Sequence, residues 1–301
     1  MLYHLLYPLR DMISGFNIFQ YITFRAGAAA LSALFIAFII GPWTIQKLRE
    51  MKIGEEIRKE GPKSHYEKHG TPTMGGVIIL LATLIPTLLF ANIFNIYVIL
   101  IFTATLWMGA IGYLDDYLKV VKKYPKGLIA GYKLLGQISL GFLIGAVIYF
   151  HPEFSEFRSV TTVPFFKNYE IDFGVFYIPM VIFVITGTSN AVNLTDGLDG
   201  LAAGLLAIAI LAFAGIVYLS GRVDFSDYLN IIYLPGIGEL TVYCAALMGA
   251  LLGFLWFNAN PAQVFMGDTG ALAGGAALGT IAVLVRKELL LLIIGGLFVA
   301  E

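Results

Sequence analysis

The chain has 301 residues, of which 58% are hydrophobic and only 13% are charged, whereas about a quarter of the residues of a soluble domain are charged. Its 19 Lys and Arg residues and 20 Asp and Glu residues give a net charge of −1, which excludes the strong basic field of a nucleic-acid-binding protein. A single cysteine, Cys244, excludes an intramolecular disulfide framework and a multi-cysteine metal cluster. The composition indicates an integral membrane protein.

The apolar segments predict an all-α, polytopic membrane helical bundle that forms a single domain over residues 1–301. Residues 1–20 are interrupted by Pro8, Arg10 and Asp11, so we expect them to lie at the membrane interface. The later segments are continuous rather than alternating, which favours helices over barrel strands. The predicted spans are 24–46, 73–91, 96–114, 134–150, 174–192, 200–219, 239–257 and 271–285. A ninth begins at Leu289 and is cut off at Glu301, so we expect a longer natural chain.

Positive charge predicts the orientation of these spans. Most Lys and Arg residues lie in segments 47–70 and 115–133, and such short basic loops normally stay in the cytoplasm. Segments 193–199 and 258–270 then share the cytoplasmic face by parity. We therefore expect the N-terminus to lie outside.

Four polar motifs fall in the loops that this topology places on the cytoplasmic face. They are TPTMGG at 71–76, DDY at 115–117, NAVNLTDGLDG at 190–200 and FMGD at 265–268. The predicted outer loops contain nothing comparable. Because carboxylates near bilayer depth are costly, their concentration at one face predicts a functional site there.

The residue types in these motifs suit phosphoryl transfer. Carboxylate and amide oxygens without sulfur favour Mg²⁺ or Mn²⁺ over zinc. Lysine ammonium groups on the same face can hold phosphate oxygens, and glycines let the backbone approach a ligand. No P-loop motif occurs. The oxygen ligands are Asp115, Asp116, Asp196, Asp199, Asp268, Asn190, Asn193 and Asn258, and the lysines are Lys68, Lys119 and Lys133.

A purely structural role is the alternative for each motif. Asp115 and Asp116 can simply end a span in water, and as helix neighbours they point about 100° apart, so they cannot do the same job. Asp196 and Asp199 stand where N-capping carboxylates are common, which makes a structural role equally well supported. Asp268 lies in an apolar loop and has the weakest structural explanation.

These motifs, in order and spacing across essentially the whole chain, resemble the family of phospho-N-acetylmuramoyl-pentapeptide-transferases. The family makes the first lipid-linked peptidoglycan precursor in the bacterial cytoplasmic membrane. The resemblance implies a homodimer of about ten-span protomers with a Mg²⁺-dependent site open to the cytoplasm. The implied reaction joins UDP-MurNAc-pentapeptide to undecaprenyl phosphate and releases UMP.

The resemblance also implies roles for individual residues. Asp268 would be a Mg²⁺ ligand, and Asp115 would be the base that deprotonates the lipid phosphate, with Asp116 beside it. Phe265 would stack on uracil. The implied substrate-binding residues are Lys68, Thr73, Lys119, Lys133, Asn190, Asn193, Asp196, Gly197, Asp199, Asn258, Phe265, Met266 and Gly267.

Two rival functions remain open at this stage. A sibling polyprenyl-phosphate transferase would use a UDP-N-acetylhexosamine donor. A cation-coupled transporter would use the carboxylates as a translocation path, but transporters place such groups near the membrane midplane, often between internal repeats. The acids here lie at span ends and no repeat is visible, which favours the transferase.

Overall fold

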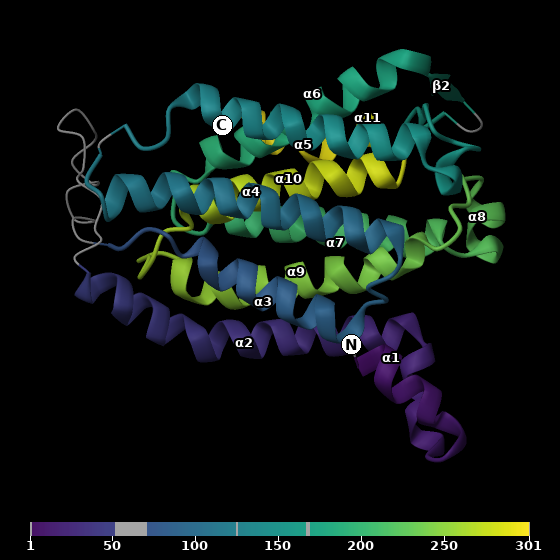
Figure 1. The fold of residues 1–301 in the computed structure, drawn as a ribbon, viewed down its shortest axis with the longest axis horizontal. Coiled ribbons are helices and arrows are strands. Elements are labelled where there is room, and N and C mark those ends of the chain that lie inside the picture. Colours follow the sequence, from purple (N-terminus) through teal and green to yellow (C-terminus); the bar gives the residue numbers. More distant parts are fainter. Residues whose placement is uncertain (1, 52–70, 125, 167–168, 301) are drawn as a thin grey trace.

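Seven long apolar helices run lengthwise through the bundle in the computed structural model, which describes residues 2–51, 71–124, 126–166 and 169–300 (Figure 1). Within these ranges all seven are long and apolar enough to cross a membrane. The all-α membrane fold is therefore confirmed. The helices are α2 (Ile22–Glu50), α4 (Ile96–Val120), α5 (Ala130–Phe150), α6 (Tyr177–Thr195), α7 (Leu201–Ser220), α9 (Leu240–Asn258) and α10 (Gly267–Leu284).

Two predicted spans are shorter as helices than the sequence suggests. The helix expected over 73–91 is α3 (Gly76–Phe90), whose 15 residues rise about 22 Å, less than the bilayer core of about 30 Å. The helix expected from Leu289 is α11 (Glu288–Ile294), which ends at Gly295 before a further short helix, α12 (Leu297–Ala300). The positions of both were predicted, but their lengths were not.

Residues 71–75 are not helical because their backbone pairs with another loop. The Phe265 N–H donates to Pro72 O at 2.8 Å, the Gly75 N–H to Phe265 O at 2.8 Å, and the Gly76 N–H to Met266 O at 2.7 Å. Backbone polar groups that are buried need hydrogen-bond partners, and this pairing supplies them. Two segments almost 200 residues apart in sequence are thus joined side by side.

The smaller elements lie mostly at the end of the bundle away from this loop pairing, at the right of Figure 1. A two-stranded antiparallel hairpin there pairs Thr161 with Ile171. The short elements are α1 (Leu2–Leu6), η1 (Tyr7–Asp11), η2 (Ser14–Gln20), η4 (Pro152–Phe154), β1 (Val160–Thr162), β2 (Glu170–Asp172), η5 (Gly174–Phe176), α8 (Val223–Leu229) and η6 (Ile237–Glu239).

Helix α10 forms the centre of the bundle, and every residue from Thr269 to Leu284 is buried. Small residues let its neighbours approach to backbone contact. A Cβ added at Gly112 of α4 would lie 2.3 Å from Asp268 O, and one at Gly76 of α3 would lie 2.0 Å from Gly270 N. Small residues at helix crossings allow such close packing in membranes. The first turn of α10 is therefore fixed tightly against α3 and α4.

Candidate active site

Three aspartates from two helices meet at one end of the bundle. Asp115 and Asp116 lie in the last two turns of α4, and Asp268 lies in the first turn of α10. One oxygen of each lies within 4.8 Å of the others, so the group is able to hold a metal ion. Asp115 and Asp116 are buried, and Asp268 is partly exposed. The close contact of Gly112 with α10 brings these carboxylates together.

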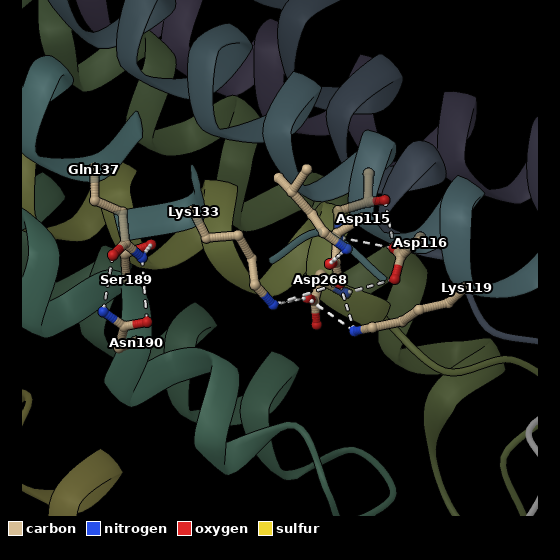
Figure 2. A network of polar contacts seen from close by, with 10 residues as sticks. Asp115, Asp116, Lys119, Lys133, Gln137, Ser189, Asn190 and Asp268 are labelled. Atoms are coloured by element: carbon tan, nitrogen blue, oxygen red, sulfur yellow. Dashed lines mark hydrogen bonds and ion pairs between the residues drawn. The ribbon is translucent and has the colours of Figure 1, made fainter. Parts of the chain in front are cut away.

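Two lysines link Asp115 to Asp268 (Figure 2). Lys119 lies one turn after Asp115 on α4; it pairs with Asp115 and reaches Asp268 Oδ2 at 3.2 Å. Lys133, from the first turn of α5, lies 3.0 Å from Asp268 Oδ2 and 3.5 Å from Asp115 Oδ2. The Leu128 N–H donates to the other Asp115 oxygen at 2.7 Å. Counted by formal charge, three carboxylates against two ammonium groups leave the cluster with one excess negative charge.

Asp116 faces the start of α10 rather than the lysines. Its two oxygens accept hydrogen bonds from the Asp268 N–H at 3.2 Å, the Thr269 N–H at 2.9 Å and the Thr269 hydroxyl at 2.6 Å. The residue preceding α10, Met266, provides no side-chain cap. The first N–H groups of a helix need acceptors, and Asp116 supplies them from α4. Asp116 thereby fixes the backbone that carries Asp268.

Asp196 caps the same helix from a third element. It follows α6, and its Oδ2 accepts the Gly267 N–H at 2.9 Å. Gly267 has a φ of +71°, and a Cβ there would meet Asp116 Oδ2 at 2.8 Å and Thr73 Oγ1 at 2.9 Å. Glycine is therefore required at this turn for both backbone conformation and space.

Asn258 and Asp199 hold the loop between α9 and α10. Asn258 is buried; its amide donates to Val264 O at 2.9 Å, and its Oδ1 accepts the Gly200 N–H at 3.1 Å. Asp199 Oδ2 accepts the Ala262 N–H at 3.3 Å. These contacts brace the loop that presents Phe265, whose side chain is half-buried.

The remaining predicted residues fall into different settings. Met266 is fully buried, and a Cβ added at Gly270 would lie 2.4 Å from its side chain. Asn193 is half-buried, and Gly197 is exposed with open space around it. Asn190 is exposed and bonds to Gln137 of α5. Lys68 lies outside the described residues.

Sequence reasoning missed Thr269 and Gln137. Thr269 donates twice to Asp116, and Gln137 is a fully buried amide one turn after Lys133. A polar residue within an apolar span is a usable signal, because such residues normally face a partner or a site. Applied to the span 134–150, that rule would have selected Gln137.

Comparison with known proteins connects this geometry to a family. A family model described as glycosyl transferase family 4 matches residues 98–286, and phospho-N-acetylmuramoyl-pentapeptide-transferase signature 1 matches residues 68–80. The chain is 49% identical over 301 residues to the phospho-N-acetylmuramoyl-pentapeptide-transferase of Thermodesulfovibrio yellowstonii, with 100% of this chain and 83% of the relative covered. The corresponding protein of Chloroherpeton thalassium is 51% identical, with 100% and 82% covered.

The chain belongs to the phospho-N-acetylmuramoyl-pentapeptide-transferase family. This confirms the resemblance drawn from the four motifs. The region matched by the glycosyl transferase model runs from α4 to the end of α10, and so contains all three clustered aspartates. The signature of the phospho-N-acetylmuramoyl-pentapeptide-transferases includes residues 71–76, whose backbone pairs with residues 265 and 266.

Proposed function

We propose that this membrane transferase moves phospho-MurNAc-pentapeptide from UDP-MurNAc-pentapeptide to undecaprenyl phosphate, giving the lipid-linked muramoyl pentapeptide and UMP. The observation that carries the proposal is the cluster of Asp115, Asp268, Lys119 and Lys133, in a chain about half identical to relatives named for this reaction. Carboxylates beside lysines at a membrane interface are suited to a diphosphate and a lipid phosphate.

The donor set fits a magnesium ion. Its atoms are all carboxylate oxygens, and the cluster carries excess negative charge. Asp268 would hold the ion, because the oxygens of Asp116 are engaged with α10 and Asp115 is the proposed base. Bound Mg²⁺ would neutralise the diphosphate of the donor.

The residues of the chain support a direct displacement. An oxygen of the lipid phosphate attacks the sugar-linked phosphorus; that P–O bond forms as the P–O bond to UMP breaks, and UMP leaves with the electron pair. We assign Asp115 as the group that takes the proton of the lipid phosphate. Lys119 and Lys133 would each give up a contact with a carboxylate and bind phosphate oxygens instead. There they would stabilise the charge that develops on the leaving UMP.

The nucleotide would lie beside this cluster. We propose that Phe265 stacks on uracil, which is worth about 1–3 kcal/mol per stacked base. Asn258 and Asp199 would act by bracing the loop that presents Phe265. The polar residues of the pocket are proposed to be Lys68, Thr73, Asn190, Asn193, Asp196 and Gly197.

We propose further that the site faces the cytoplasm of a bacterial cell and that the enzyme acts as a homodimer. The positive charge of sequence segments 47–70 and 115–133 supports this orientation. The product would serve peptidoglycan synthesis and hence cell-wall biogenesis, cell shape and division.

Release of UMP tests the proposal. Purified protein receives UDP-MurNAc-pentapeptide with and without undecaprenyl phosphate, and with Mg²⁺ or EDTA. We expect UMP only when lipid phosphate and Mg²⁺ are both present. Asp224→Asn, an exposed change on α8 at the other end of the bundle, is the control and should match the wild type.

The rival functions give different results in the same assay. Faster turnover of UDP-N-acetylhexosamine than of the muramoyl donor would assign the sibling transferase. Cation flux into proteoliposomes without any nucleotide sugar would assign a transporter. A radiolabelled protein–phosphosugar adduct would replace direct displacement with a covalent route.

A further inference from the structure

A series of hydrogen-bonded amide and hydroxyl side chains leads from the centre of the bundle to the proposed donor pocket. Gln137 of α5 is 1% exposed, yet its side chain contacts Ser189 and Asn190 of α6 (Figure 2). Gln137 stands one helical turn after Lys133, which reaches Asp268. One face of α5 therefore serves both the acidic cluster and Asn190.

Main-chain carbonyl groups fix the direction of every hydrogen bond among Gln137, Ser189 and Asn190. The Ser189 hydroxyl donates to Leu272 O at 3.1 Å, so its oxygen accepts from Gln137 Nε2 at 3.3 Å. The same Nε2 donates to Asn190 Oδ1 at 3.2 Å. Because a carbonyl can only accept, Leu272 O sets the orientation of the Gln137 amide.

The orientation of the Asn190 side chain is fixed in the same way. Asn190 Nδ2 donates to Thr186 O at 2.9 Å and to Gln137 Oε1 at 3.0 Å. An asparagine amide has two hydrogens, and these two acceptors use both. Asn190 Oδ1 retains one lone pair, and the residue is exposed. Asn190 therefore offers its surroundings a hydrogen-bond acceptor.

We propose that Gln137 is a positioning residue that orients Asn190 so that its carbonyl oxygen accepts a hydrogen bond from a hydroxyl or N–H group in the UMP part of the nucleotide sugar. This inference rests on the proposed function, because it assigns Asn190 to the donor pocket. Gln137 itself touches no substrate. Its reciprocal amide pair prevents Asn190 from turning its NH₂ group outward.

Binding and turnover of Gln137→Met test the inference. Methionine keeps the length and apolar fit of the side chain but makes none of these hydrogen bonds. One lost hydrogen bond corresponds to about a 3- to 10-fold weakening. We expect the Kd for UMP, measured by titration calorimetry, and the KM for the nucleotide sugar to rise by that factor. The kcat should stay within about 2-fold, because a contact equal in ground and transition states affects KM alone.

A double-mutant cycle separates positioning from a merely structural role. If Gln137 acts through Asn190, Gln137→Met should weaken UMP binding in the wild type but not in Asn190→Ala. In Gln137→Glu, an ionised glutamate can accept a hydrogen bond from Asn190 but has no hydrogen to donate to Asn190 Oδ1. This variant should bind UMP at least as weakly as Gln137→Met. Ser139→Ala, which removes a local bond to Gly136 O on the same helix, is the matched control.

Three results would overturn the inference. They are unchanged UMP binding in Gln137→Met, an equal loss in the Asn190→Ala background, and wild-type binding in Gln137→Glu. Failure of the proposed function looks different, because the wild-type protein would then release no UMP from the muramoyl donor.

Discussion

The two ends of the bundle both bury charge, but they balance it differently. At the end opposite the site, Arg25 is 1% exposed and pairs with Glu239 through two contacts of 2.6 and 2.7 Å, and it also donates to Phe90 O. Arg286, also buried, bonds to Tyr177, which in turn donates to Glu288 at 2.9 Å. Both of these buried arginines have a carboxylate counterpart, which Arg25 contacts directly and Arg286 reaches through Tyr177.

At the site end, by contrast, single lysine nitrogens are shared between two carboxylates, and one negative charge is left over. Lysine is a compact charge on a flexible stem, whereas arginine holds a planar bidentate geometry. The arginine pairs therefore fix the positions of chain segments, while the lysine cluster is able to exchange partners, as the proposed binding of phosphate requires. Excess charge and shared partners, rather than buried charge itself, distinguish the end that we propose to be the active site.

The largest expected effect is on catalysis at the site end. Asp268→Asn removes the carboxylate that both lysines contact, and we expect UMP release to fall to background. The fold should persist, with little change in Tm, because the asparagine keeps the shape of the side chain. Turnover near the wild-type rate would remove Asp268 from the metal site.

The next largest effect is on stability at the opposite end. Glu239→Ala leaves the Arg25 guanidinium buried without its carboxylate, which costs about 3–5 kcal/mol. Tm should fall markedly, while the KM of the remaining folded enzyme for the nucleotide sugar stays unchanged. A changed KM with an unchanged Tm would contradict the division between the two ends.

Asp116→Asn should reduce both UMP release and the Tm. Both oxygens of Asp116 accept hydrogens, so an asparagine would turn its NH₂ group toward an N–H or hydroxyl at the start of α10. An unsatisfied buried group costs about 1–3 kcal/mol. We expect turnover and Tm to fall together, unlike in Asp268→Asn. A loss of turnover with wild-type Tm would make Asp116 a reacting group instead.

The smallest effect concerns the exposed hairpin, where the hydrogen bond from the Ser159 hydroxyl and the Gly174 N–H lower the pKa of Asp172. A carboxylate whose pKa is lower in the folded state stabilises the fold above its unfolded pKa. That contribution disappears as the pH falls through the folded pKa. Asp172→Asn should lower Tm slightly at neutral pH and not at acidic pH, as differential scanning fluorimetry would show.

The sequence predicted the positions of the helices because continuous apolar segments in a membrane leave the backbone little alternative to a helix. It could not predict that α3 begins only at Gly76, because the pairing of residues 72–75 with 265 and 266 is a contact between distant segments. The sequence also did not predict that the last helix ends at Gly295, because no polar residue interrupts the apolar segment before that position.

The site was predictable in part. Adjacent aspartates on a helix must point in different directions, and the structure directs Asp115 to the lysines and Asp116 to α10. Which one faces which partner depends on the helix crossing at Gly112, which no local pattern encodes. The same holds for Gln137, whose role is defined by Ser189 and Asn190 of another helix.

The burial of α10 from Thr269 to Leu284 has a consequence for how the enzyme is assembled. Among the long helices of the described residues it has the lowest mean hydropathy, and more than half of its residues are glycine or alanine, which gain little from lipid. Such a helix is stabilised mainly by neighbouring helices rather than by acyl chains. We therefore expect α10 to settle late during membrane integration, so that partly inserted molecules remain inert.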